Sequence, residues 1–326
     1  MKHATTRPRM GTNGVGATRP LYSAALVAVA LLIGCAARPA QVARTSDDFG
    51  VLVMAHGGGA EWNRNVAAAL APIGAHYPTE IAFGMADAVS LQDGVRKLEA
   101  KGVGRIGVVR LFVSGESWYE RTEQILGLKP GALAKPATGD HADHGEHAGH
   151  SMAFWQLNAD ASFALSKQGL ADAPEMGAVL AERARGLSRD PGHEDVLILA
   201  HGPGDDAENQ RWIDQINARA DTVRQALPFR RVQVETLRED WPDKRKAAEL
   251  RIRAFVERAS KESGRAIVIP FRVEGFGPYG KVLDGLDYLS DGRGLVPSPQ
   301  VTQWVRRQAE ELHRVGFRSS GDAHSR

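Results

Sequence analysis

The sequence has little of what marks several common protein classes. It contains one cysteine in 326 residues, which excludes an internal disulfide framework. Aromatic residues make up only 6% of the chain, which argues against a platform for stacking nucleic-acid bases. The formal net charge is +2 and acids and bases are interspersed, so the sequence predicts no nucleic-acid partner. Beyond one apolar run near the N-terminus, the composition is that of an ordinary soluble globular protein.

That apolar run has the features of an export signal. Residues 1–20 carry four basic residues and no acid, and the segment LYSAALVAVALLIG follows. Its length of about 14 residues is short of the ~20 that span a membrane. It ends at Leu32-Ile33-Gly34-Cys35, which resembles the lipobox of bacterial lipoprotein precursors. We therefore expect lipidation of Cys35 and a lipid anchor on the periplasmic side of the cell envelope, with an uncleaved anchor as the alternative. Ala36 in place of Asp favours the outer membrane.

A pair of similar segments dominates the rest of the chain. VLVMAHGGGAEWN begins at Val51, and VLILAHGPGDDAEN begins at Val196. Each is an apolar run that ends in Ala-His-Gly-X-Gly, which indicates a duplicated unit. The segments place His56 and His201 at the carboxyl ends of two strands, and ligands bind at that edge of an open parallel sheet.

Strand and helix patterns alternate in both halves. Strands are expected from Phe49, Thr79, Arg105 and Ala266, and at 195–201 and 230–237. Helices are expected at 61–75, 91–100, 212–227, 244–260 and 301–315, with Pro72 ending the first a turn early. Such alternation predicts an α/β protein of two duplicated βαβ lobes, with parallel sheets flanked by helices.

The same patterns give the domain boundaries. We expect a lipoprotein signal peptide at 1–34, a linker at 35–48, a first lobe at 49–136, a His-rich insert at 137–152, a connecting segment at 153–193, a second lobe at 194–315 and a disordered tail at 316–326.

The insert is the most biased segment. His141, His144, His147 and His150 alternate with acids, so four of the chain's 11 histidines lie within ten residues. Imidazole is a common ligand of Co, Ni, Cu and Zn ions, and a flexible chain folds several rings round one ion. We interpret the insert as a metal collector; the alternative is a polar loop without a task. The pattern does not select among the ions.

The repeated His-Gly turns carry the candidate chemistry. Gly57 and Gly202 permit a tight strand-to-helix turn, and free amides at the next helix suit an anionic substrate group. A neutral imidazole at His56 or His201 accepts a proton or holds a divalent ion. The alternative is that both histidines merely cap their turns.

Two better-known glycine motifs do not fit. The oxyanion loop of lipase-like hydrolases needs a Gly-X-Ser-X-Gly elbow, and the nearest match, 115–119, lacks the final glycine. The dinucleotide fingerprint needs a third glycine, where Trp62 and Ala207 stand.

The order of motifs resembles the class II tetrapyrrole chelatases, the sirohydrochlorin cobalt- and ferrochelatases of the CbiX/SirB type. The opening strand and His-Gly turn match at VLVMAHGGG and VLILAHGPG. The third strand matches at VVRLFVSGES, from Val108, and VIPFRVEGFG, from Val268, and VPSPQVTQWV, from Val296, is similar to the closing segment. The resemblance covers residues 49–127 and 194–315.

The resemblance implies an ATP-independent lyase that inserts Co²⁺ or Fe²⁺ into a tetrapyrrole; Ni²⁺ is a further candidate ion. His56 or His201 would take a pyrrole proton and relay the metal. Arg110 and Arg272 are candidates to pair with the substrate's carboxylates; the alternative for either is a solvated structural arginine.

This chain departs from the family pattern. The family's second histidine falls at Trp118 in the first half and at Pro278 in the second, and neither side chain binds metal. Glu116 is the expected substitute ligand, with Glu120 and Glu274 nearby. Export also differs from the cytoplasmic setting of tetrapyrrole metal insertion. A second hypothesis is therefore a lipid-anchored periplasmic protein that binds metal or a corrinoid without catalysis.

Overall fold

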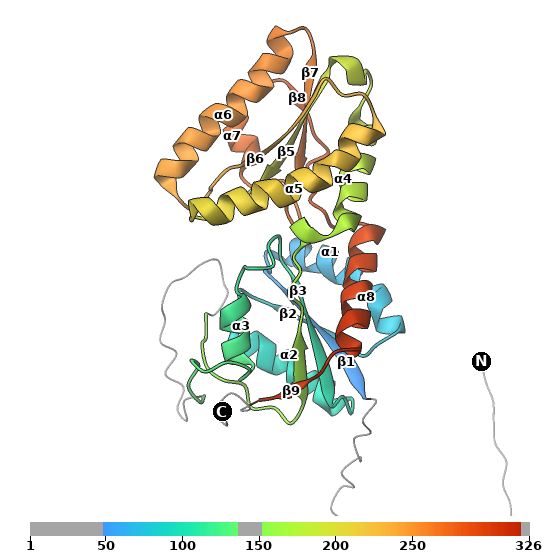
Figure 1. The fold of residues 1–326 in the computed structure, drawn as a ribbon, viewed down its shortest axis with the longest axis vertical. Helices are drawn as coiled ribbons and strands as arrows, with labels where there is room; N and C mark the ends of the chain where they lie inside the picture. The colour runs from blue at the N-terminus through green and yellow to red at the C-terminus, as the bar shows by residue number, and fades with distance from the viewer. Residues whose placement is uncertain (1–47, 136–151, 321–326) are drawn as a thin grey trace, which may run out of the picture. The chain divides into compact units, whose positions relative to one another are not determined.

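A computed structural model describes residues 48–135 and 152–320, which form two lobes, each built on a mainly parallel sheet (Figure 1). The strand orders are β2-β1-β3-β4-β9 and β6-β5-β7-β8. The strands are β1 (Phe49–Ala55), β2 (Thr79–Phe83), β3 (Arg105–Leu111), β4 (Ser162–Leu165), β5 (Glu194–Ala200), β6 (Arg231–Thr236), β7 (Arg265–Pro270), β8 (Tyr288–Leu289) and β9 (Arg318–Ser319).

Helices alternate with these strands, as the α/β prediction requires. They are α1 (Ala60–Leu70), α2 (Ala88–Ala100), α3 (Tyr119–Ile125), α4 (Pro174–Leu187), α5 (Asp206–Ala226), α6 (Pro242–Lys261), α7 (Tyr279–Val282) and α8 (Pro299–His313). Three 3₁₀ turns are η1 (Ala71–Ala75), η2 (Leu170–Asp172) and η3 (Pro191–His193). The predicted fold class, parallel sheets flanked by helices, is confirmed.

All residues of the central strands β1 and β5 are buried, and apart from Glu194 and Asp195 at the start of β5 none of them is charged or polar, because both faces of each sheet are covered. In β1, Val51 and Val53 belong to one core cluster with α1 and α8, whereas Leu52 and Met54 belong to another with α2. The same alternation holds in β5, whose seven residues are all buried. Each central strand pairs in parallel with both neighbours, so β1 and β5 fix where the His-Gly turns begin.

Pro72 has the effect that its geometry predicts. Helix α1 ends at Leu70, and the chain continues as η1 with the proline in its first turn. Proline has no N–H to donate and its ring clashes with the preceding turn, so the α-helical hydrogen bonds cannot continue. Helix α5 begins at Asp206, six residues before the start expected at 212, because the Asp205 side chain accepts a hydrogen bond from the Glu208 amide at 2.8 Å.

Residues 153–193, expected to be a connecting segment, contain regular structure. Strand β4 pairs in parallel with β3 and extends the first sheet. Helix α4 follows, contacts α5 and β7, and contributes Met176 and Leu180 to the core cluster that includes β5. The segment escaped the pattern analysis because β4 has four residues and α4 carries many small side chains.

The C-terminal elements return to the first lobe. Helix α8, expected to close the second lobe, contacts β3, α1 and α4 (Figure 1, red). The Thr302 hydroxyl donates to the Ala69 carbonyl in α1 at 2.7 Å. Strand β9 lies in the expected disordered tail but pairs antiparallel with β4. The tail prediction is therefore wrong for Arg318–Ser319, because an antiparallel edge supplies partners that a local pattern cannot show.

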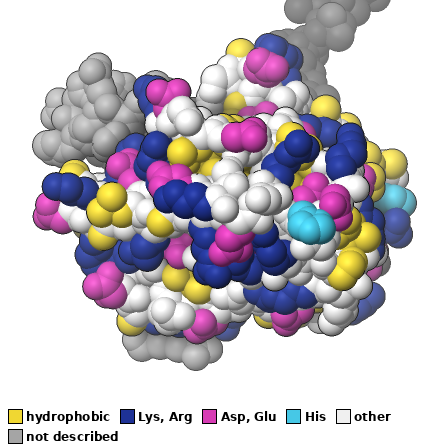
Figure 2. All heavy atoms as spheres, turned by 90° about the horizontal axis from the view of Figure 1, so that it is seen from above, with side chains coloured by type: hydrophobic (Ala, Val, Ile, Leu, Met, Phe, Trp, Pro, Cys, Tyr) yellow, Lys and Arg dark blue, Asp and Glu magenta, His cyan; other side chains and the backbone are white. Residues whose placement is uncertain are grey.

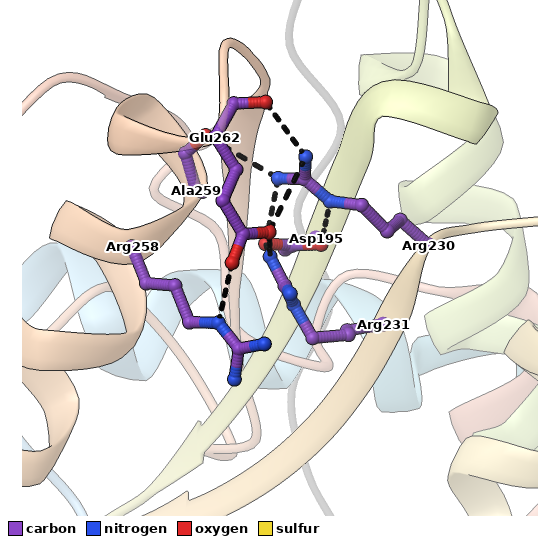
Figure 3. Close-up of polar contacts among 6 residues, drawn as sticks. All are labelled: Asp195, Arg230, Arg231, Arg258, Ala259 and Glu262. Carbon is purple, nitrogen blue, oxygen red and sulfur yellow. Dashed lines mark hydrogen bonds and ion pairs between the residues drawn. The ribbon is translucent and has the colours of Figure 1, made fainter.

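A cluster of charged side chains lies at the amino end of β5, opposite the end that His201 follows (Figure 3). Asp195 has no exposed surface and accepts hydrogen bonds from Arg230 at 2.9 and 3.0 Å and from Arg231 at 2.5 Å. Glu262 pairs with Arg231 at 2.6 Å and with Arg258 at 2.8 Å. Figure 2 shows Lys and Arg side chains interspersed with Asp and Glu on the face seen from above.

In the described part of the chain, no helix is long and apolar enough to cross a membrane. The predicted signal peptide, the lipidation site Cys35 and the four histidines of the insert lie outside the described residues and stay predictions.

Candidate functional site

Both predicted His-Gly turns follow central strands at the carboxyl edge of their sheets. Strand β1 ends at Ala55 before His56, and β5 ends at Ala200 before His201. Gly57 and Gly202 have φ values of 81° and 75°, in the left-handed region that favours glycine. At Gly202 a Cβ atom would also lie 2.6 Å from Cβ of Thr236. These glycines therefore set the turn geometry; no contact with a substrate group is needed to explain them.

His56 is exposed and has a defined tautomer. Its Nδ1 lies 2.9 Å from the carbonyl oxygen of Gly57. A carbonyl only accepts hydrogen bonds, so Nδ1 carries the proton and donates it. In the neutral ring this leaves the lone pair on Nε2. The backbone thus orients the imidazole with Nε2 as the nitrogen that can bind a metal or accept a proton.

His201 is half-buried and is held as a neutral imidazole. Its ring packs edge-on against Trp212, with centroids 4.8 Å apart and an interplanar angle of 81°. Burial lowers the pKa of His201 to about 4, and the positive charge of Arg272 lowers it further, against an opposing effect of Asp240.

The lowered pKa predicts a specific acid sensitivity. Above the ordinary histidine pKa of 6.5, His201 is neutral in both folded and unfolded chains. As the pH falls from there to about 4, the unfolded chain binds a proton that the folded protein rejects, so stability is lost. Between pH 7 and 4, we expect His201→Asn to lose about 2 kcal/mol less unfolding free energy than wild type, after allowance for solvent screening. Urea unfolding at each pH measures this. Equal losses would contradict it, and the exposed His193→Asn serves as the control.

The turn after His201 is fixed by two basic residues that the sequence analysis did not single out. Arg238 is buried, has a left-handed φ of 55°, and donates to the carbonyls of Pro203 and Gly204 and to Asp206. Lys244 donates to the Gly204 carbonyl at 2.7 Å. The sequence gives only a weak indication of these roles, because a basic residue that follows a strand can serve many purposes.

The turn after His56 has fewer such contacts. The Gly58 amide donates to the Asn63 side chain at 2.9 Å, and a Cβ at Gly58 would lie 2.8 Å from Cγ of Trp62. The N-cap residue of α1 is Gly59, which has no side chain to accept a capping hydrogen bond. The second turn is therefore tied by charged side chains, whereas the first is open to solvent.

Arg110, predicted to bind a substrate carboxylate, is occupied by the protein itself. Its side chain is 1% exposed and donates to the carbonyls of Ser166 at 3.0 Å, Ser117 at 2.5 Å and Gly115. Its guanidinium also lies over the ring of Tyr119, and burial lowers its pKa to about 10. Arg110 lies within β3, whose faces are covered, and its guanidinium holds the loop that follows this strand, so its donors are engaged here and its substrate role stays a prediction.

Arg272, the matching residue after β7, is paired with Glu239 but keeps part of its guanidinium surface exposed. Its Nη1 lies 2.9 Å from both carboxylate oxygens of Glu239, and its guanidinium lies 5.6 Å from the centroid of the Tyr279 ring. A Cβ at Gly277 would lie 2.8 Å from Cζ of Arg272, so this glycine leaves room for the guanidinium. The Arg272 side chain is 25% exposed, and its positive charge lowers the pKa of His201.

Glu116, the expected substitute metal ligand, is paired with a cation from the other lobe. Arg211 in α5 donates to its two carboxylate oxygens at 2.8 and 2.7 Å, and these bonds hold the pKa of Glu116 below its ordinary value. Asn65 in α1 also donates across the lobes, to Glu274 at 3.0 Å. Glu116 therefore joins the lobes in this structure, and a metal would have to displace Arg211 to reach it.

The positions of the family's second histidine do not supply a ligand. Trp118 has a left-handed φ of 59° and packs against the first lobe's core, and Pro278 precedes α7. Within residues 48–135 and 152–320, no group of three or more His, Cys, Asp or Glu side chains is arranged to hold a metal ion. A groove of ≈ 510 Å³ lies elsewhere, between β4 and the end of α8, and none of the predicted site residues lines it.

Comparison with known proteins supports the fold. The chain matches no protein-family model and no curated protein. It is similar to the structure of SirB from Bacillus subtilis with Fe³⁺, with a TM-score of 0.57 and 13% identity over 82% of this chain and 96% of that one. It is also similar to the sirohydrochlorin chelatase SirB from Bacillus subtilis subspecies spizizenii in complex with cobalt, with a TM-score of 0.50 and 13% identity over 82% and 94%. The chain thus has a class II tetrapyrrole chelatase-like fold.

Proposed function

We propose that the chain handles a divalent metal ion and a tetrapyrrole at the paired His-Gly turns, as a metallochelatase does. One observation carries the proposal: His56 and His201 directly follow the equivalent central strands β1 and β5, each at the carboxyl edge of its sheet. The chelatase-like fold and the metals bound by SirB support the choice of ligand class. Co²⁺, Fe²⁺ and Ni²⁺ are the candidate ions, since all bind imidazole.

The residues fit the required proton chemistry. Insertion of M²⁺ into the macrocycle releases two pyrrole protons, so the site must offer neutral bases. His56 presents Nε2 because its Nδ1 proton is bound by Gly57, and His201 stays neutral at pH 7 because of its lowered pKa. Both rings can therefore hold the incoming ion or accept a proton. Arg272, with part of its guanidinium exposed, is placed to pair with a carboxylate of the macrocycle.

A non-catalytic role is the second candidate function. Trp118 and Pro278 replace the second histidine of the resemblance, and the described residues offer no third ligand beside the pair. Two imidazoles are enough to bind an ion or a corrinoid. Without a third ligand, they hold the ion less firmly than its insertion into a macrocycle would require. This candidate also fits the predicted lipid anchor at Cys35 in the cell envelope.

One assay separates the two functions. Purified protein starting at residue 36 is mixed with sirohydrochlorin and Co²⁺, and the absorbance change that accompanies metal insertion is followed. A chelatase raises the rate above that of the protein-free mixture. A binding protein shifts the spectrum in proportion to its concentration and leaves the insertion rate unchanged.

The insert adds a separate prediction about metal capacity. Arg121 donates to the carbonyl of Met152, and the Asp87 carboxylate accepts from the Ala153 amide, so the chain after the insert is fixed just beyond β2, at the carboxyl edge of the first sheet. Deleting residues 140–150 is expected to remove weak, multi-site binding of Ni²⁺, Co²⁺ or Zn²⁺ while the fold persists, because that segment has no large apolar side chain. Calorimetry counts the ions. An unchanged stoichiometry would refute the collector role, and binding should weaken below about pH 6 as imidazoles protonate.

A further inference from the structure

Trp241 is the one tryptophan in the described chain that takes no part in a hydrophobic core. The sequence has six tryptophans, and the other five belong to core clusters or pack against them. Trp241 appears in none of the three clusters and is 37% exposed. A singly exposed apolar side chain is common, so what distinguishes Trp241 is the turn against which its ring lies.

The indole lies against the turn that follows His201. A Cβ atom at Gly204 would lie 2.3 Å from both Cε2 and Nε1 of Trp241, so the ring contacts the bare backbone there. The main chain fixes this position: the Trp241 amide donates to the Arg238 carbonyl at 3.0 Å, and its carbonyl accepts from Arg245 at 2.8 Å. Arg238 in turn donates its own amide to the His201 carbonyl. Trp241 is thus held against the turn that follows His201, and a short chain of backbone hydrogen bonds links it to the His201 carbonyl.

We propose that Trp241 is a substrate-positioning residue that stacks on the face of a planar tetrapyrrole. The inference rests on the proposed function and adds the residue that recognises the macrocycle face. An indole offers a broad apolar surface with two side-chain torsions to restrain, and it stacks on any conjugated ring. His201 then meets the pyrrole nitrogens, and Arg272 meets an edge carboxylate. The first lobe has a counterpart in Trp62 beside Gly58, but that ring packs against the core and Phe83.

The test uses metal-free uroporphyrin, a planar tetrapyrrole with carboxylate edges, titrated into the protein starting at residue 36 and followed by its absorbance. Trp241→Ala is expected to weaken porphyrin binding about tenfold, the usual loss of one aromatic stacking partner. Trp241→Phe keeps a ring and should stay within about twofold of wild type. Leu250→Ala, which removes a 67% exposed apolar side chain from α6, the helix that Trp241 precedes, is the matched control and should bind as wild type.

Co²⁺ binding by calorimetry separates this inference from the proposed function. Trp241→Ala should remain folded, as thermal unfolding will show, and should bind Co²⁺ as wild type does, because the ring is neither a ligand nor part of a hydrophobic core cluster. Porphyrin binding that is equal in wild type and Trp241→Ala, or absent from wild type, overturns the inference; metal handling at the histidines stands if Co²⁺ still binds there. If porphyrin binding depends on Trp241 but no Co²⁺ is inserted, the inference holds and the chelatase function fails.

Discussion

Replacing Asp195 with asparagine is expected to lower the free energy of unfolding by about 3 kcal/mol. The carboxylate is fully buried and is the common partner of Arg230 and Arg231 (Figure 3). Removing one member of a buried ion pair leaves the remaining charges desolvated without compensation, which typically costs about 3–5 kcal/mol. We expect the lower end of that range, because both guanidinium groups are about one-fifth exposed and Glu262 still pairs with Arg231.

Urea unfolding measures this loss, and the chain offers a matched control. Glu257→Gln also removes one carboxylate from the second lobe, but Glu257 forms a loose pair with the exposed Lys261 at 3.5 Å. Such surface pairs contribute less than about 1 kcal/mol. Asp195→Asn should still bind Co²⁺ while folded, because Asp195 lies near the amino end of β5 and His201 follows the opposite end. A loss for Asp195→Asn no larger than that of the control would show that the cluster is not a folding determinant.

The central part of the fold could be predicted because its strands are marked by short apolar runs within the local sequence. β1 and β5 are buried on both faces, so they read as continuous apolar runs that end at a glycine turn. The elements that escaped prediction depend on distant partners. β4 has four residues and is stabilised by β3, and the placement of α8 on the first lobe is a contact between segments far apart in the chain.

The candidate site was predictable in residue type but not in arrangement. Glycine patterns fixed the two turns, and hence His56 and His201. Whether an arginine at a strand end faces solvent or its own loop depends on the register of the whole strand, so Arg110 and Arg272 looked alike in sequence and differ in the structure. Arg238 and Trp241 were missed because a turn held by side-chain bonds to backbone carbonyls leaves no motif.

Replacing both His56 and His201 with alanine is expected to abolish the proposed Co²⁺ insertion into sirohydrochlorin and the proposed metal binding at the turns. The two turns offer no other pair of neutral bases. Each single variant should therefore lose most of the insertion rate, and the double variant should insert Co²⁺ no faster than the protein-free mixture. Losing exposed His56 should change stability by no more than about 0.5 kcal/mol, as is usual at the surface. His201→Ala should cost about 1 kcal/mol more, because the ring packs against Trp212.

His193→Ala is the matched control for this last experiment, since that histidine is exposed and pairs with Asp190 at the amino end of β5. It should insert and bind Co²⁺ as wild type does. Thermal unfolding of all variants distinguishes loss of chemistry from loss of fold. If the single and double variants keep the wild-type metal binding yet unfold many degrees lower, both histidines are turn residues, and the proposed function loses its foundation. If binding falls in the variants while wild type itself shows no insertion, the protein captures metal without transferring it.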